Sequence, residues 1–362
     1  MQITVLCKVV DNFGDIGVVY RLSKQLKKIN PENQINLVVD NLLSFQKICS
    51  TVRCDTPKQE VEGLVLYDWN AQDLCHREFS RDDGALMPVI LECFQCGRPD
   101  WMERILFEEK LNRTVQIIMI DYLTAEKYAE DFHCLQSLTR SAKVQKVNFM
   151  PGFTEKTGGL VIDDEWREVP VCKADGPVLV FTYERNWCEL VRALGERSVL
   201  VAQGRGKESF MAAVEACGAG SFVEELPYLN QPDWDKVMKE CSALVVRGEE
   251  SMSRACLSGI PFIWHAYPQS DEYQLVKVRA LLERMRRHFD KEDFKIVEKT
   301  WLDINSAPSS LQVAENQSNP YQDFFESIDR LAPSFYDFAL SLRKNGDLAA
   351  NLMTYIEKLA II

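Results

Sequence analysis

Two aspartates four positions apart, Asp11 and Asp15, share the stretch DNFGDIG with Gly14 and Gly17. A short apolar run precedes this stretch and apolar residues at helical spacing follow it, which predicts a strand, a tight turn and a helix. The glycines permit backbone geometry that is closed to other residues. A carboxylate pair at such a turn can hold a cationic group and accept a proton as a general base. The same carboxylates could instead only cap the helix start, so a structural role stays open.

The stretch VVRGEESMSRACLSG is a second candidate site. A predicted strand ends here, Arg247 turns the chain and a helix begins after it. The free N–H groups of a helix start, together with serine hydroxyls and a guanidinium, can hold a diphosphate. Glu249 and Glu250 could take sugar hydroxyls. The alternative is a capped helix in which Ser251 and Ser253 only satisfy the first turn.

Short apolar runs alternate with helical stretches along the chain, and this alternation predicts parallel sheets covered by helices. Residues 150–177 carry glycines, prolines and charges without sustained periodicity, which indicates a connection between two domains. We therefore expect an α/β fold with domains at 1–172 and 173–340, and a C-terminal helix at 341–362 that crosses back to the first domain. Ligands of open α/β sheets lie outside the carboxyl ends of the strands, where both candidate sites fall.

The composition limits the class of partner. A net charge of −12 over 362 residues would repel a nucleic-acid backbone. The sequence has no apolar run of about 18 residues to span a membrane, and its first residues lack the pattern of a signal peptide. Twelve cysteines are scattered without the framework of a disulfide-rich protein. We therefore expect a cytoplasmic protein with reduced thiols, no nucleic-acid partner and no membrane association.

Other familiar motifs fail on inspection. The dinucleotide fingerprint G-x-G-x-x-G is absent, and two carboxylates at the helix start would repel a pyrophosphate, which argues against a dehydrogenase. GRGKES, at 204–209, lacks the first glycine of a phosphate-binding loop and has Glu208 in place of Ser or Thr. CFQC, at 93–96, has no second cysteine pair at zinc spacing. The four histidines are far apart in the sequence, so we expect no metal site and no histidine triad.

Four motifs occur along the chain in the order DNFGDIGVVYRLSKQL, MIDYLTAEKYAEDFHCLQS, PGFTEKTGGL and RGEESMSRACLSGIPFIWHAYPQSDEY. In type and order they resemble the EarP family, whose members are protein-arginine rhamnosyltransferases. The motifs run from residue 3 to about residue 290, and the layout is similar to the family over the whole chain. Because several unrelated motifs recur in the right order, the resemblance is highly specific.

The resemblance implies a GT-B glycosyltransferase fold, in which two Rossmann-like domains face each other across a cleft. It implies that the N-terminal domain binds the acceptor and the C-terminal domain binds the nucleotide sugar. The implied donor is dTDP-β-L-rhamnose, and the implied acceptor is one arginine of elongation factor P, whose modification helps ribosomes through polyproline stretches. Members of the family invert the anomeric centre and use neither a metal nor another cofactor.

The resemblance also assigns roles to single residues. Asp11 and Asp15 match the paired aspartates of the family, and the second of them is the proposed general base. Two positions depart from the family pattern and are left without an assigned role, since the family usually has Asp where Glu250 stands and His where Tyr273 stands. The positions that match the nucleotide-sugar site are Phe181 and Tyr183 near the thymine, Arg247, Glu249, Ser251 and Ser253 at the diphosphate, and Tyr267 and Gln269 beside the nucleotide.

The chemistry of the residues agrees with this transfer. An arginine acceptor has a pKa above about 12 and keeps its proton at neutral pH, so its attack on a sugar needs help. Asp15 can orient a guanidinium nitrogen and take its proton, while Asp11 holds the group or the turn. Arg247 and the helix start would stabilise the leaving diphosphate on the opposite side, which gives inversion.

Two other functions stay open at this point. One is a GT-B transferase or a nucleotide-sugar epimerase that acts on a small molecule or a lipid. The other is a nucleotide-sugar-binding module without turnover, although binding alone does not need the two carboxylates of DNFGDIG.

Overall fold

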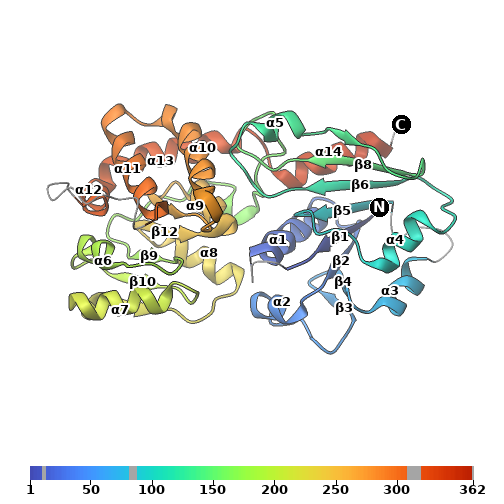
Figure 1. Ribbon diagram of the computed structural model, residues 1–362, viewed down its shortest axis with the longest axis horizontal. Helices are drawn as coiled ribbons and strands as arrows, with labels where there is room; N and C mark the ends of the chain where they lie inside the picture. The colour runs from blue at the N-terminus through green and yellow to red at the C-terminus, as the bar shows by residue number, and fades with distance from the viewer. Residues whose placement is uncertain (10–13, 81–87, 308–318, 361–362) are drawn as a thin grey trace. The chain divides into compact units, whose positions relative to one another are not determined.

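The structure is a computed structural model that describes residues 1–9, 14–80, 88–307 and 319–360 (Figure 1). The chain divides into two compact units. The N-terminal unit comprises Met1–Asp163 and Lys344–Ile362, and the C-terminal unit comprises Asp164–Arg343. The C-terminal segment therefore belongs to the same unit as the first strands. The domains expected from the sequence had their boundaries at 172/173 and 340/341.

The N-terminal unit is built on a sheet whose described strands lie in the order β3-β4-β2-β1-β5-β6-β8-β7. The strands from β4 to β8 in that order run parallel, and only the short edge strands β3 and β7 are antiparallel to their neighbours. Their bounds are β1 Gln2–Cys7, β2 Gln34–Val39, β3 Lys58–Val61, β4 Leu64–Asp68, β5 Val89–Cys93, β6 Val115–Ile120, β7 Gln136–Ser137 and β8 Val144–Phe149.

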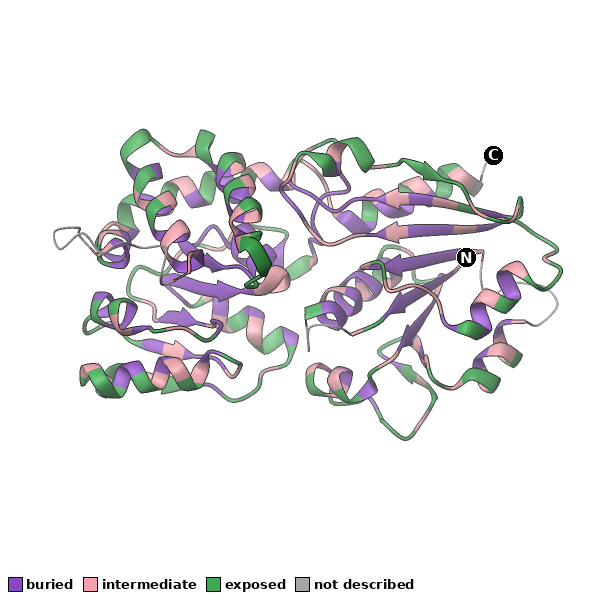
Figure 2. Ribbon diagram, viewed as in Figure 1, coloured by how far each residue is buried: buried purple, intermediate pink, exposed green. Residues whose placement is uncertain are grey.

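Helices cover both faces of this sheet because neighbouring residues of each strand point to opposite faces. Val5 of β1 packs into a core with α1 and α14, whereas Leu6 packs into a second core with α3 and α4. Figure 2 shows the central strands as mostly buried and the outer faces of the helices as largely exposed. The helices of this unit are α1 Gly14–Ile29, α2 Leu42–Ile48, α3 Gln72–Phe79, α4 Asp100–Phe107, α5 Tyr128–Phe132 and α14 Leu348–Ala360.

The C-terminal unit has a fully parallel sheet, whose described strands lie in the order β11-β10-β9-β12-β13. All of its strand carboxyl ends therefore lie at one edge. The strands are β9 Val178–Val180, β10 Val199–Val201, β11 Val223–Glu225, β12 Ala243–Arg247 and β13 Phe262–His265. The helices are α6 Cys188–Leu194, α7 Lys207–Cys217, α8 Gln231–Lys239, α9 Gly248–Ser258, α10 Gln274–Met285, α11 Lys291–Asn305, α12 Pro320–Glu326 and α13 Ile328–Arg343.

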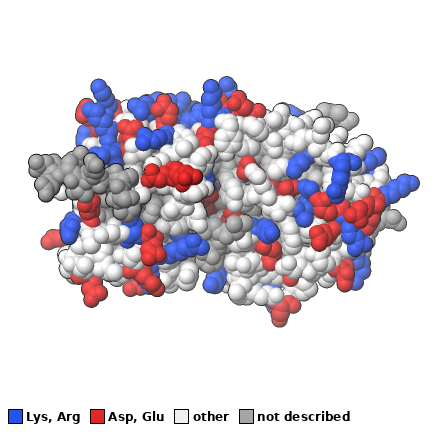
Figure 3. Space-filling model, in the orientation of Figure 1, with Lys and Arg blue, Asp and Glu red and all other residues white. Residues whose placement is uncertain are grey.

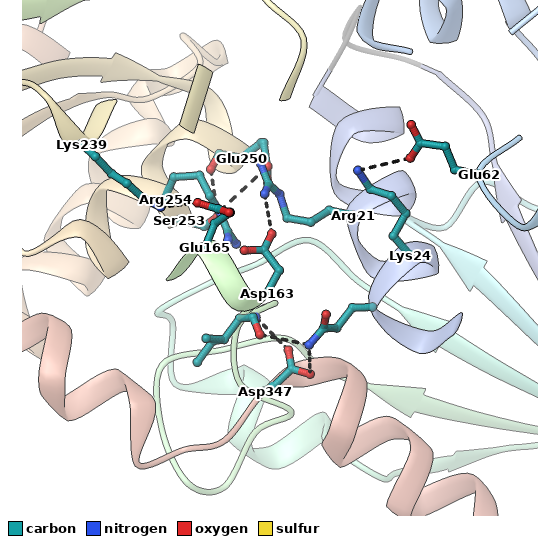
Figure 4. Close-up of polar contacts among 12 residues, drawn as sticks. Arg21, Lys24, Glu62, Asp163, Glu165, Lys239, Glu250, Ser253, Arg254 and Asp347 are labelled. Carbon is teal, nitrogen blue, oxygen red and sulfur yellow. Dashed lines mark hydrogen bonds and ion pairs between the residues drawn. The ribbon is translucent and has the colours of Figure 1, made fainter. Parts of the chain in front are cut away.

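Polar contacts fix helix α1 to the segments where the chain leaves and re-enters the N-terminal unit. Arg21 of α1 pairs with Asp163 at 2.5 Å (Figure 4). Asp347 accepts hydrogen bonds from the Ile162 N–H at 2.7 Å and from Gln25 Nε2 at 3.4 Å, and burial raises the pKa of its carboxyl group. These contacts hold in place the helix whose first turn carries Asp15.

Arg343 fixes the other candidate helix, α9, within the C-terminal unit. Its Nη2 donates to the carbonyl oxygens of Leu257 at 2.9 Å and Trp166 at 2.7 Å. Leu257 lies in the last turn of α9, where carbonyl groups have no partner within the helix and a cation is favourable. Burial lowers the pKa of Arg343 to about 10, so the side chain stays charged at neutral pH.

Figure 3 shows Lys and Arg interspersed with Asp and Glu over the visible side of each unit. None of the helices in the described residues has the length and the apolarity that a crossing of the bilayer demands.

Candidate active site

The N-terminal unit places Asp15 at the carboxyl edge of its sheet. Asp15 lies in the first turn of α1, the helix that follows β1, and is only 4% exposed. The Tyr122 hydroxyl, which follows β6, donates to Asp15 Oδ1 at 3.2 Å. Phe94, which follows β5, stacks on the Tyr122 ring at 4.5 Å between centroids. Residues that follow three neighbouring strands, β1, β5 and β6, are thus linked at this edge through Tyr122.

The other predicted residues of DNFGDIG are placed differently. Asp11 lies outside the described residues. Gly14 and Gly17 belong to α1 itself, rather than to the turn before it, so the expectation that they shape that turn does not match their positions. A Cβ atom added at Gly14 would meet no described atom within 4 Å. Among the described residues, nothing crowds the helix start at Gly14.

The C-terminal unit brings four predicted residues together at the carboxyl edge of its sheet. Arg247, at the end of β12, lies with its Cζ atom 4.5 Å from the centroid of the Phe181 ring and 4.6 Å from that of Tyr183. The Tyr267 ring meets that of Tyr183 edge-on at 5.4 Å. These contacts fix the guanidinium by cation–π attraction at the start of α9.

The aromatic residues differ in how much surface they offer to a nucleotide base. Tyr183 is only 4% exposed and its ring contacts Arg247, so it has little area left for stacking on thymine. Phe181 is half-buried and touches Trp234 as well as Arg247. Tyr267 is 45% exposed. Tyr267 and Phe181 are thus the better candidates for contact with a flat base.

Helix α9 begins at a glycine with a positive φ. Gly248 has a φ of +66°, a conformation that favours glycine, and its carbonyl oxygen accepts a hydrogen bond from Trp264 Nε1 at 3.0 Å. The N–H groups of the first turn have no partner within the helix, and the helix dipole makes this end electropositive. Arg247, directly before this turn, adds a full positive charge.

The polar residues of α9 are already engaged to different degrees. The Ser253 hydroxyl donates to the Glu250 carbonyl oxygen at 2.8 Å and accepts from Arg254 Nε at 3.3 Å, so the helix itself uses it (Figure 4). Glu249 pairs with Lys277 at 3.3 Å. Ser251 is buried in the same turn. Of the two serines, Ser251 is the better candidate for a diphosphate oxygen.

The remaining positions include the two departures from the family pattern. The Glu250 carboxylate lies 3.9 Å from the guanidinium of Arg254, whose side chain is 1% exposed (Figure 4). Glutamate is longer than the aspartate that the family usually has at this position, and Arg254 gives it a partner. Tyr273 is 45% exposed just before α10. The N–H group of Gln269 donates to Gln274 Oε1 at 3.0 Å, and the Gln269 side chain is exposed beyond β13.

Three cysteines near the ends of β1 and β5 have raised pKa values. Burial raises the pKa of Cys7 and of Cys93 well above the usual value, and raises that of Cys96 to about 12. All twelve cysteines lie among the described residues and are free. Within those residues no group of three His, Cys, Asp or Glu side chains could hold a metal ion.

The sequence analysis did not predict three residues that lie at these sheet edges, namely Tyr122, Phe94 and His265. His265 ends β13, is 4% exposed and contacts the Tyr183 ring. Each of the three stands at the end of a parallel strand or directly after it, where side chains reach the ligand-binding edge of a sheet. That position is the signal that could have identified them.

Solved structures with the same arrangement of elements are glycosyltransferases with the GT-B fold. One, described as the structural basis for EarP-mediated arginine glycosylation of translation elongation factor EF-P, matches with a TM-score of 0.60 and 18% identity over 98% of both chains. The glycosyltransferase of kitacinnamycin matches with a TM-score of 0.51 and 12% identity, over 99% of this chain and 98% of that one. The expected GT-B fold, with two Rossmann-like domains, is confirmed.

The chain belongs to the EarP family. The family model described as Elongation-Factor P (EF-P) rhamnosyltransferase EarP matches residues 3–357. A protein-arginine rhamnosyltransferase of Shewanella oneidensis is 29% identical over 98% of this chain and 97% of its own length. That of Pseudomonas aeruginosa is 30% identical over 77% of this chain and 80% of its own length. The predicted family and the predicted enzyme class, a glycosyltransferase, are thereby confirmed.

Proposed function

We propose that this protein transfers rhamnose from dTDP-β-L-rhamnose to one arginine of elongation factor P, with inversion and without a metal ion. The N-terminal unit would bind the acceptor and the C-terminal unit the donor. The single observation that carries the proposal is the family match over residues 3–357, within which Asp15 is a buried carboxylate at a sheet edge. The modified factor would then support translation of polyproline stretches.

Asp15 acts as the general base in this proposal. An arginine side chain is almost fully protonated at neutral pH, so its nitrogen lone pair becomes available only as a proton leaves. Asp15 orients the guanidinium, and one guanidinium nitrogen attacks the anomeric carbon while its proton passes to the carboxylate. The bond between this carbon and the diphosphate oxygen breaks, and dTDP leaves with the electron pair. Asp11 is proposed to hold the same guanidinium or the turn.

The start of α9 stabilises the leaving group. As the sugar departs, negative charge grows on the diphosphate, and preorganised donors aimed at that charge lower the barrier. Arg247 supplies a guanidinium already fixed by two rings, and the first turn of α9 supplies N–H groups. Ser251 is proposed to donate to a diphosphate oxygen, Glu249 to contact the donor, Tyr267 and Phe181 to contact the thymine, and Gln269 to lie beside the nucleotide.

We propose the cytoplasm as the compartment, since elongation factor P acts on ribosomes. The twelve free cysteines support a reducing environment. The acidic net charge of −12 argues against nucleic acid as a partner.

Incubation of the protein with dTDP-β-L-rhamnose and elongation factor P, followed by the intact mass of the factor, tests the proposal. We expect a gain of one deoxyhexose on a single arginine, and no gain when that arginine is replaced by lysine. Release of dTDP without any change in the mass of the factor would instead indicate a small-molecule acceptor. Binding of the donor without release would indicate a module that only binds.

Removal of the Tyr122 hydroxyl should slow transfer. A hydrogen bond to a charged group contributes about 1.5–3 kcal/mol, so we expect Tyr122→Phe to lower kcat by about tenfold or more because Asp15 is less well held. The affinity for dTDP should not change. Tyr336→Phe, on an exposed tyrosine of α13, is the matched control in the same rate assay. An unchanged kcat in Tyr122→Phe would show that the 3.2 Å contact does not position the base.

Two glycines after β10 should respond differently to alanine. A Cβ at Gly204 would lie 2.9 Å from Phe181 Cε2 and 3.1 Å from Arg247 Nη2, so those side chains must shift. We expect Gly204→Ala to raise the KM for the donor by about tenfold, equivalent to ~1.4 kcal/mol, with little loss of stability. A Cβ at Gly206 would lie 2.4 Å from the Thr182 carbonyl oxygen, and Gly206→Ala should lower the free energy of unfolding by about 2 kcal/mol.

Donor kinetics and thermal unfolding of both variants check these expectations. The opposite pattern, with Gly204→Ala unstable but kinetically normal, would contradict the placement of Phe181 and Arg247 at the donor site.

A further inference from the structure

His265 contacts Tyr183, one of the two aromatic residues that pack against Arg247. It is the last residue of β13, is only 4% exposed, and packs edge-on against the Tyr183 ring at 5.3 Å and the Trp187 ring at 5.4 Å. It lies at the carboxyl edge of the sheet, yet the proposed mechanism gives it no role. A buried polar side chain in such a place needs a partner, and that partner indicates its role.

The partner is the main chain of Tyr183. The Tyr183 N–H group donates to His265 Nδ1 at 3.3 Å. A backbone N–H can only donate, so Nδ1 carries no proton and the imidazole is neutral, with its proton on Nε2. Burial, together with the positive charges of Arg185 and Arg247, lowers the pKa of His265 to about 3. The ring therefore stays neutral at physiological pH and serves as a permanent acceptor.

The hydrogen bond fixes the segment that holds Arg247. Tyr183 and Phe181 follow β9, and their rings contact the Arg247 guanidinium at 4.6 Å and 4.5 Å. Loss of the acceptor at His265 would remove this hydrogen bond to the buried Tyr183 N–H group and loosen the segment. The guanidinium would then lose part of the support that its two aromatic neighbours provide.

We propose that His265 is a positioning residue for the donor: through the Tyr183 N–H group it holds the Phe181–Tyr183 segment, and thereby Arg247, in place for the diphosphate. This inference rests on the proposed function, because it takes a nucleoside diphosphate as the ligand of this edge. It concerns a residue that does not itself touch the reacting atoms.

Two substitutions separate this role from simple packing. His265→Phe keeps an aromatic ring against Tyr183 and Trp187 but removes the acceptor. His265→Asn removes the ring but can place its Oδ1 atom close to the position of Nδ1. If His265 only filled space, the Phe variant would bind nucleotide better than the Asn variant. If it positions the segment, the Asn variant binds better, although it is the less well packed of the two.

Calorimetric titration of dTDP into the full-length protein, without acceptor, is the measurement. We expect the Kd for dTDP to rise about tenfold in His265→Phe, the loss of one hydrogen bond, and by less than about threefold in His265→Asn. In transfer assays the KM for the donor should follow the same order. Thermal unfolding, measured in parallel, should rank the variants in the opposite order.

His265→Gln provides a second comparison if the Phe variant does not fold. Its amide oxygen can reach the position of Nε2 but not that of Nδ1, so we expect weaker dTDP binding than in His265→Asn. Binding in Phe or Gln that equals or exceeds binding in Asn would overturn the inference. A wild-type protein that binds dTDP but leaves elongation factor P unmodified would refute the proposed function alone, while one that does not bind dTDP would refute both.

Discussion

Asp15→Asn is expected to lower the rate of transfer to elongation factor P by about 10³-fold, within the range of general-base catalysis. Asparagine has nearly the same shape as aspartate, so the Tyr122 hydroxyl keeps an acceptor and the fold of α1 should persist. It cannot take the proton of the attacking guanidinium, nor attract its charge. Because the proposed donor site lies on the other unit, the Kd for dTDP should stay within about twofold of the wild-type value.

Asp73→Asn is the matched control for this variant. Asp73 is also an aspartate in the first turn of a helix of the N-terminal unit, but it is exposed on α3. Its replacement should leave the transfer rate unchanged. Single-turnover rates and dTDP titrations of the two variants make the comparison. Retention of wild-type rates in Asp15→Asn, or a marked loss of its affinity for dTDP, would contradict the role assigned to this carboxylate.

Arg247→Gln is expected to lower kcat/KM for the donor by about 10³-fold, the upper end of what one preorganised donor to a developing negative charge contributes. The substitution removes the positive charge before α9 and the cation–π contacts with Phe181 and Tyr183. Part of the loss should appear as weaker dTDP binding, since dTDP carries the same diphosphate. Arg247→Lys should recover only part of the activity. The lysine ammonium keeps the charge, but it cannot donate two parallel hydrogen bonds to a phosphate as the planar guanidinium can.

Arg192→Gln tests whether the effect follows from the site or from the change in net charge. Arg192 is exposed on α6 of the same unit, and its replacement should leave donor kinetics unchanged. Equal losses in the two glutamine variants would point to a general electrostatic effect. Normal dTDP affinity and normal kcat in Arg247→Gln would remove Arg247 from the donor site.

The parallel sheets were predictable because their strands are short apolar runs bounded by turns. Strand β1 and strand β12 both show this pattern, and the carboxyl ends of these strands lead to Asp15 and Arg247. Edge strand β7 was not predictable, since its two residues, Gln136 and Ser137, are polar and exposed. Its pairing depends on its position beside β8, which no local pattern reveals.

Contacts between distant segments account for the residues that sequence reasoning missed. Tyr122 reaches Asp15 across 107 positions of the sequence, and His265 reaches Tyr183 across 82. No spacing rule relates such pairs, because the sheet order decides which strand ends are neighbours. The sequence also predicted Ser253 as a diphosphate ligand, whereas its hydroxyl is engaged by its near neighbours Glu250 and Arg254 within α9.

The stereochemistry of the product tests the central claim most directly, because a single displacement assisted by Asp15 must invert the anomeric centre. The measurement is the anomeric configuration of the rhamnosyl-arginine, determined by NMR on modified elongation factor P made from dTDP-β-L-rhamnose. The account predicts the α configuration. A β-linked product, formed with retention, would contradict direct attack by arginine from the face opposite the leaving diphosphate, with Asp15 as its base.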